Sequence, residues 1–216
     1  MPPPFKFLVF GATGGTGRHF VSLALQAGHK VTALVRNPAK LPFQDANLTV
    51  HQGSITEEVD LDNLVHGVDF VVIMLGDVNL QKDAQINAAF VQKLVPAMRR
   101  HGVKRLLYQA GGLSKPYGGQ LSPMLWVLRN TLARGYAGQH EDNEAVMAYL
   151  ATAANDLEWM VHRAGIGSDG PTKGTLKRSP DKFSVATHRD CAAYNYRTVM
   201  DPSAIRTCSL SYYEKD

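Results

Sequence analysis

Short apolar runs rich in β-branched residues alternate along this chain with longer segments whose apolar positions recur every three or four residues. The first pattern is typical of buried strands and the second of helices with one apolar face. The patterns predict strands at 5–10, 31–35, 48–51, 69–75, 104–109 and 157–162, and helices at 17–27, 57–66, 83–101, 124–134 and 138–153.

Strands that alternate with helices in this way predict an α/β fold, in which helices cover both faces of a parallel sheet. We expect a Rossmann-type, doubly wound sheet in a single domain that spans residues 1–216. In such sheets ligands bind beyond the carboxyl ends of the strands. Functional residues are therefore expected directly after each strand.

Two segments interrupt this alternation. Residues 111–123 have the composition of a loop, and residues 164–180 are rich in Gly, Pro, Ser and Lys. The second segment is either a plain surface loop or a mobile flap over the site. We expect 111–136 and 164–180 to form a small substrate region within the domain.

Composition limits the class of partner. The 216 residues carry a net charge of +4 with 44% hydrophobic residues, which suits one globular domain. The Lys and Arg residues are scattered, which favours a small anionic molecule over nucleic acid. The longest apolar run, 70–75, is too short to span a bilayer, and no leader-like segment precedes the first strand. We expect a cytoplasmic protein without a membrane partner, and the oligomeric state stays open.

The two cysteines, Cys191 and Cys208, lack the spacing of a metal site. We expect free thiols in a reducing compartment and no bound metal.

A glycine cluster, "GATGGTG", follows the first predicted strand and opens the first predicted helix. In this context free backbone amides can hold a dinucleotide pyrophosphate. Gly11 would permit the tight turn, Gly14 the approach of phosphate, and Gly17 the packing of helix against strand. Thr13 and Thr16 offer hydroxyl groups to the same oxygens. The alternative is a tight turn that binds nothing.

The second strand ends at Arg36, with Lys40 four residues later, and no Asp or Glu lies between Val31 and Phe43. An NAD site usually has an acidic residue there for the ribose 2′-hydroxyl, whereas a cation suits a 2′-phosphate. The sequence therefore favours NADP, unless Arg36 is merely a solvated residue at a strand end.

Later strands also end in small or polar residues. "QGSI" (52–55) and "LGD" (75–77) follow the third and fourth strands, where adenine and its ribose would lie. "AGG" (110–112) follows the fifth, where the nicotinamide would arrive.

These motifs resemble those of the atypical short-chain dehydrogenases/reductases, in particular the NmrA-like NAD(P)H-binding proteins of the flavin reductase (biliverdin reductase B) type. The resemblance rests on "GATGGTGRHFVSLALQAGHKVTALVRNPAKLP", "DFVVIMLGD", "MRRHGVKRLLYQ" and "LEWMVHRAGIGSDGPTKG". It implies a Rossmann-type fold that binds NADP. The residues that it implies for the coenzyme are Gly11, Thr13, Gly14, Gly15, Thr16, Gly17, Arg36, Lys40, Ser54, Ile55, Leu75, Gly76, Gly111, Gly165 and Ile166.

The chain departs from that family at the reacting end of the site. Gly111 and Ile166 stand where related reductases have a serine and a histidine, and a Tyr-x-x-x-Lys pair is absent from the sequence. The nearest substitute is Tyr136 with His140, whose imidazole could hold a ribose hydroxyl or relay a proton. The alternative is an ordinary exposed helix face.

Other residues are ranked lower. Ser114, Tyr117, His162 and Arg163 are polar candidates near strand ends, and Trp126 and Trp159 are expected in the core or in a pocket wall.

Three functions remain open. The first is an NADPH-dependent oxidoreductase that transfers hydride to a flat conjugated small-molecule substrate, such as a flavin, quinone or enone. The second is an NADP-binding sensor or partner-binding protein without catalysis. The third is a non-redox isomerase or cyclase on the same fold.

Overall fold

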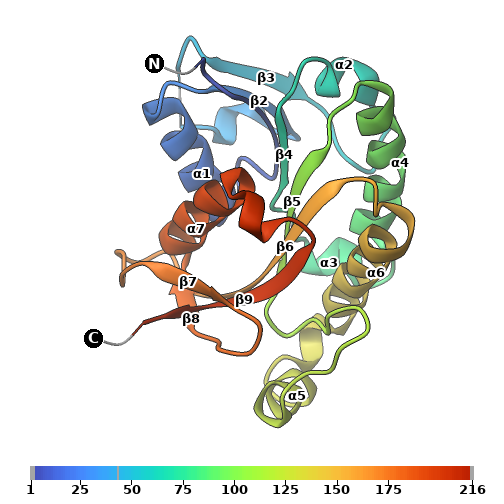
Figure 1. The fold of residues 1–216 in the computed structure, drawn as a ribbon, viewed down its shortest axis with the longest axis vertical. Coiled ribbons are helices and arrows are strands. Elements are labelled where there is room, and N and C mark those ends of the chain that lie inside the picture. The colour runs from blue at the N-terminus through green and yellow to red at the C-terminus, as the bar shows by residue number, and fades with distance from the viewer. Residues whose placement is uncertain (1–2, 43, 215–216) are drawn as a thin grey trace.

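The computed structural model, which describes residues 3–42 and 44–214, contains a nine-stranded sheet with helices on both faces (Figure 1). The strands are β1 (Lys6–Phe10), β2 (Lys30–Val35), β3 (Leu48–Gln52), β4 (Phe70–Ile73), β5 (Arg105–Gly111), β6 (Glu158–Ser168), β7 (Leu176–Ser179), β8 (Val185–Thr187) and β9 (Thr207–Tyr213). The α-helices are α1 (Gly15–Gln26), α2 (Leu61–Val65), α3 (Val78–Gln81), α4 (Ile86–Arg100), α5 (Pro123–Asn130), α6 (Ala137–Ala153) and α7 (His188–Met200), with 3₁₀ turns η1 (Pro38–Lys40), η2 (Arg134–Tyr136) and η3 (Pro202–Ala204).

The strand order places the site. The sheet runs β3-β2-β1-β4-β5-β6-β9-β7, and β8 pairs with β6. The pairings are parallel except that of β7 with β9. After β1 the chain adds β2 and β3 on one side of that strand. It then crosses to the other side of β1, where β4, β5 and β6 follow in order. The crevice beyond the ends of β1 and β4 is thus the point where the direction of winding changes, which is where ligands bind in such sheets.

Successive side chains of β1 point to opposite faces of the sheet, and each face has its own hydrophobic core. Phe7 and Val9 pack under α1 and α7, whereas Leu8 and Phe10 pack under α4 and α6. All four side chains are buried. A strand buried on both faces appears in sequence as a continuous apolar run, as it does here. The predicted doubly wound parallel sheet in a single domain is confirmed.

One predicted helix is divided. The expected helix over 83–101 begins only at Ile86, and a separate short helix, α3, precedes it. The backbone amides of Asn87 and Ala88 donate to the buried carboxylate of Asp142, at 2.9 Å each. Because Asp142 lies on α6, far along the chain, the start of α4 is set by a tertiary contact that local periodicity cannot reveal.

The prediction of a loop over 164–180 is wrong in part. β6 extends to Ser168, and residues 176–179 form β7. A Cβ at Gly165 would lie 2.4 Å from the Phe183 ring, so this glycine allows close packing rather than flexibility. The hydrophobic pattern did not predict β8, β9 or α7.

The remaining differences are small. α1 begins at Gly15 instead of 17, α2 covers only 61–65 of the expected 57–66, and α5 ends at 130. Gly28 follows α1 with φ of 79°, as expected of a residue that ends a helix. Within the described ranges no helix is long and apolar enough to cross a membrane.

Candidate functional site

The loop between β1 and α1 depends on two of its glycines. Gly11 has φ of 88°, and a Cβ there would lie 2.3 Å from the Met74 carbonyl oxygen. A Cβ at Gly17 would lie 2.0 Å from the carbonyl oxygen of Gly11. Both contacts are impossible for a larger residue. These two positions therefore build the turn and bring α1 against it.

The amino end of α1 is arranged to receive an anion. Gly14 occupies the N-cap position with no side-chain hydrogen bond to the helix, and the first turn, all of it described, contains no acidic residue. The first backbone amides of a helix have no partner within it, and the helix dipole adds positive potential there. A phosphate group is a fitting ligand for such an end.

Two hollows meet at this loop. The first, of about 130 Å³, follows the ends of β1, β2 and β3; the second, of about 570 Å³, follows β5 and β6. Both are lined by Gly14, Met74, Leu75 and Gly76, so an elongated ligand can extend from one to the other across the glycine loop.

Most of the predicted coenzyme residues lie in these hollows. Those lining the first are Gly11, Thr13, Gly14, Arg36, Ser54, Ile55, Leu75 and Gly76; those lining the second include Gly14, Gly15, Thr16, Leu75, Gly76, Gly111, Gly165 and Ile166. Two predicted residues line neither. Gly17 packs against the loop, and Lys40 is exposed on η1.

Arg36 reaches the first hollow from the end of β2. Its side chain is 68% exposed, and its Nη1 lies 3.2 Å from Oδ2 of Asp77. The other oxygen of Asp77 accepts the Leu80 amide at 3.3 Å and caps α3. An ion pair this exposed contributes little to stability, so most of the guanidinium donors remain accessible to a ligand.

His140 is buried in the wall of the second hollow, and Tyr136 precedes it by one turn. The histidine is 5% exposed, and neither ring nitrogen has a hydrogen-bond partner among the described residues. Burial, and then the positive charge of Arg129, lower the pKa of His140, so the ring is neutral near pH 7. Tyr136 is 47% exposed and lines the same hollow. The alternative of an ordinary exposed helix face is therefore wrong for His140.

The second hollow also contains residues that sequence reasoning missed. His188, the first residue of α7, lies against Gly15 and hydrogen-bonds through Nδ1 to the Thr16 hydroxyl at 3.0 Å. Asn143 lies one turn after His140 on α6 and accepts the Tyr108 hydroxyl at 2.6 Å. Helical spacing from His140 could have indicated Asn143. The sequence around His188 resembles the family's segment that opens the last helix, but it does not indicate the contact of His188 with the glycine loop.

Gln109 and Phe183 line the same hollow and were also missed. Gln109 is the last residue of the predicted strand 104–109 and lies near the end of β5, where a functional residue was to be expected, whereas Phe183 lies in a segment without a recognised pattern.

The lower-ranked polar candidates lie outside both hollows. His162 is buried, donating from Nδ1 to Asn195 Oδ1 at 2.7 Å and accepting from the Ser211 hydroxyl at 2.9 Å. Burial lowers the pKa of His162 to about 4. Arg163 is buried and donates to the Ser114 carbonyl oxygen at 3.0 Å, and Tyr117 is exposed. Within the described part of the chain, no group of three or more His, Cys, Asp or Glu residues is placed to hold a metal.

Comparison with known proteins gives matches of three kinds: a protein family, a relative in sequence and solved structures. The family described as NAD(P)H-binding matches residues 11–202. The isoflavone reductase homolog IRL of Zea mays is 33% identical over 133 residues, which are 57% of this chain and 40% of that protein. The chain thus matches about two fifths of the length of this relative.

Two solved structures share the fold over nearly the whole chain. The anaerobilin reductase ChuY from Escherichia coli O157:H7 has a TM-score of 0.73 at 17% identity, covering 95% of this chain and 96% of that one. A short-chain dehydrogenase/reductase from Veillonella parvula has a TM-score of 0.72 at 14% identity, covering 97% and 94%. At these identities the likeness concerns the fold alone.

Proposed function

The chain belongs to the NAD(P)H-binding family, in agreement with its resemblance to the atypical short-chain dehydrogenases/reductases, and from that premise we propose an NADPH-dependent reductase. Its acceptor would be a flat, conjugated small molecule of the flavin, quinone or enone type. The observation that carries this proposal is the pair of hollows that meet at the glycine loop.

The residues of the two hollows fit the parts of a dinucleotide. The amino end of α1 would bind the pyrophosphate, and Ser54, Ile55 and Leu75 would enclose the adenine. Gly76 keeps the passage open, since a Cβ there would lie 3.0 Å from the Gln139 amide nitrogen. Gly111 would let the nicotinamide lie close to the backbone in the second hollow, whereas Gly165 makes room for the Phe183 ring that forms part of its wall.

The choice of NADP over NAD depends on Arg36. Its guanidinium can form two parallel hydrogen bonds to a phosphate, and its exposed ion pair with Asp77 is a weak competitor. Asp77 supports the opposite choice, because a carboxylate at this edge could accept a ribose hydroxyl. We favour NADP, since phosphate offers a guanidinium more charge than a single carboxylate does.

The second hollow suits an apolar acceptor. Its lining includes the apolar side chains of Leu113, Leu128, Leu132, Ile166, Phe183 and Val185, beside polar ones that include Gln109, Gln139 and His140. Apolar walls with a small number of convergent polar groups are typical of small-molecule sites. Bound NADPH would supply the hydride, and these walls would hold a planar ring against it and exclude water.

His140 would orient or protonate the acceptor. A neutral imidazole offers one donor and one acceptor nitrogen, and both are unpartnered here. Tyr136, which is 47% exposed and lines the same hollow, could pass a proton inward from solvent. A flavin or quinone can also take protons from water, so His140 would matter most for an enone.

The test is NADPH oxidation, followed by absorbance, with purified protein and a panel of flavin, quinone and enone acceptors. Steady oxidation above the rate without protein supports the reductase. The apolar Gly111 and Ile166, which replace the polar residues of related reductases, favour a second candidate, a coenzyme-binding sensor. Tight NADPH binding without turnover across the panel would support that candidate instead.

A further inference from the structure

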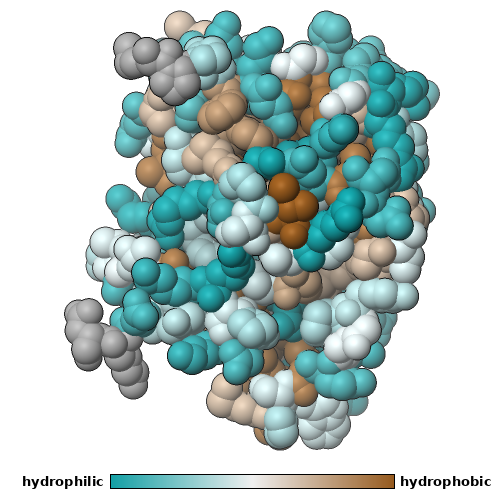
Figure 2. All heavy atoms as spheres, in the orientation of Figure 1, coloured by the Kyte–Doolittle hydropathy of each residue, from teal (hydrophilic) through white to brown (hydrophobic). Residues whose placement is uncertain are grey.

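The end of the molecule around α5 exposes an unusual number of large apolar side chains. Of the eleven large hydrophobic residues that are exposed in the described chain, six lie within 117–136. We define the α5 patch as Tyr117, Met124, Trp126, Val127 and Leu132, which are 58%, 60%, 59%, 50% and 84% exposed. The expectation that Trp126 packs in the core or a pocket wall is thus wrong. α5 lies at the lower end of Figure 1, where apolar residues reach the surface in Figure 2.

Most of the α5 patch does not face the second hollow. Leu125 is 2% exposed, and Leu128, three residues later, lines the hollow. Trp126 and Val127 turn away from that face of the helix, whereas Met124, one turn before Leu128, lies at its edge and is still 60% exposed. Closure of α5 over a bound substrate would therefore leave Trp126 and Val127 exposed. The patch needs another partner.

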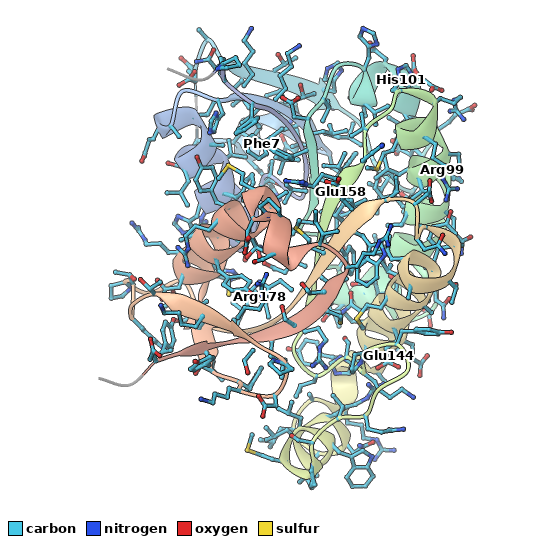
Figure 3. All side chains as sticks on the ribbon, viewed as in Figure 1. Phe7, Arg99, His101, Glu144, Glu158 and Arg178 are labelled. Carbon is cyan, nitrogen blue, oxygen red and sulfur yellow. The ribbon has the colours of Figure 1, made fainter. Side chains whose placement is uncertain are left out.

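Charge around the patch favours an anionic partner. Between Gly111 and His140 the chain has no Asp or Glu, and it has Lys115, Arg129 and Arg134. Arg129 pairs with Glu144 of α6, which is labelled in Figure 3 where α6 approaches the α5 segment. Lys115 and Arg134 are exposed. The patch is thus apolar with a basic border.

We propose that the α5 patch docks on the surface of an anionic lipid bilayer. Apolar side chains with an exposed Trp enter the headgroup boundary, while neighbouring cations meet lipid phosphates. A second copy of the chain fits less well, because a symmetric contact would bring this basic border against itself. The expectation of no membrane partner rested on the lack of a spanning segment, which surface docking does not need. Leu132 belongs both to the patch and to the wall of the second hollow, so docking turns the hollow toward the lipid.

The proposal is tested by sedimentation of the purified full-length protein with extruded vesicles. Vesicles of phosphatidylcholine with phosphatidylserine are compared with vesicles of phosphatidylcholine alone. We expect binding to the mixed vesicles, with roughly tenfold weaker binding to the neutral ones. The double variant Trp126→Ser, Leu132→Ser should lose about tenfold or more, because it removes two large inserting side chains. Val50→Ser, at an exposed apolar position on β3 outside the patch, should bind like the unmodified protein.

Circular dichroism must show that both variants fold. No binding to mixed vesicles, equal binding to both kinds of vesicle, or full binding by the double variant overturns the proposal. A dimer detected by light scattering that the double variant converts to a monomer also overturns it, since a second copy would then cover the patch. The sedimentation needs neither coenzyme nor acceptor, so its result is separate from that of the turnover assay.

Discussion

Replacement of Arg36 by Gln should weaken NADPH binding far more than NADH binding. The variant keeps a polar side chain of similar length but loses the charge and the paired donors that would face a 2′-phosphate. We expect β2, which ends one residue before Arg36, to be unaffected, because the Arg36 side chain is 68% exposed and pairs with Asp77.

The expected size follows from two opposed effects. Hydrogen bonds between a guanidinium and a phosphate contribute about 1.5–3 kcal/mol. Arg36 must give up part of its exposed pair with Asp77, which contributes about 0.2–1 kcal/mol. The middles of the two ranges leave a net loss of about 1–2 kcal/mol, or roughly five- to thirtyfold in Kd for NADPH. NADH, which lacks the 2′-phosphate, should change by less than about twofold.

Isothermal titration calorimetry with each coenzyme measures the Kd for NADPH and the Kd for NADH. Two matched variants separate the effect of Arg36 from that of the charges near it. Asp77→Asn removes the competing carboxylate and should tighten NADPH about two- to fivefold. Lys40→Gln removes a nearby charge outside both hollows and should cost less than about threefold. Equal weakening of NADPH and NADH by Arg36→Gln, or no weakening of either, would refute the assignment of Arg36.

Three further predictions concern folding and proton transfer. Gly17→Ala should destabilise the protein by about 3 kcal/mol in thermal unfolding, because its Cβ would meet a carbonyl oxygen at 2.0 Å, whereas Gly28→Ala, with open space around it, should cost only about 1 kcal/mol. His140→Ala should lower kcat on an enone about tenfold or more with the Kd for NADPH unchanged; a loss confined to coenzyme binding would contradict its role. His162 must stay neutral in the folded state, with a pKa of about 4 against 6.5 when unfolded, so urea unfolding should show stability falling from pH 6.5 toward pH 4 by up to about 3 kcal/mol. His162→Gln should flatten that fall, and an unchanged pH dependence would exclude His162 as its source.

The sheet and its winding could be predicted because the chain's local patterns agree with the tertiary fold. The apolar run of β1 is continuous since both faces of the strand are buried, and the glycine loop follows it directly. The helix and strand boundaries that were predicted wrongly depend on groups that are far away in the sequence. α4 starts where Asp142 of α6 caps it, and β6 continues past Gly165 because β8 pairs with it there. No local signal encodes either contact.

The residues of the candidate site likewise divide into those that the sequence could place and those that it could not. Residues that end parallel strands, such as Arg36 and Gly111, could be placed from strand order alone. His188 could not, because it reaches the glycine loop from α7, after a stretch of chain whose strands were not recognised. The exposure of Trp126 was also hidden, since an aromatic residue at helical spacing gives the same pattern whether its face meets the core or solvent.

The most direct test of the central claim is calorimetric titration of the unmodified protein with NADPH and, separately, with NADH. We predict one NADPH bound per chain, held at the glycine loop, and binding of NADH that is at least about fivefold weaker. If neither coenzyme produces a binding isotherm, the glycine loop and its two hollows do not form a dinucleotide site, and the proposed reductase is excluded.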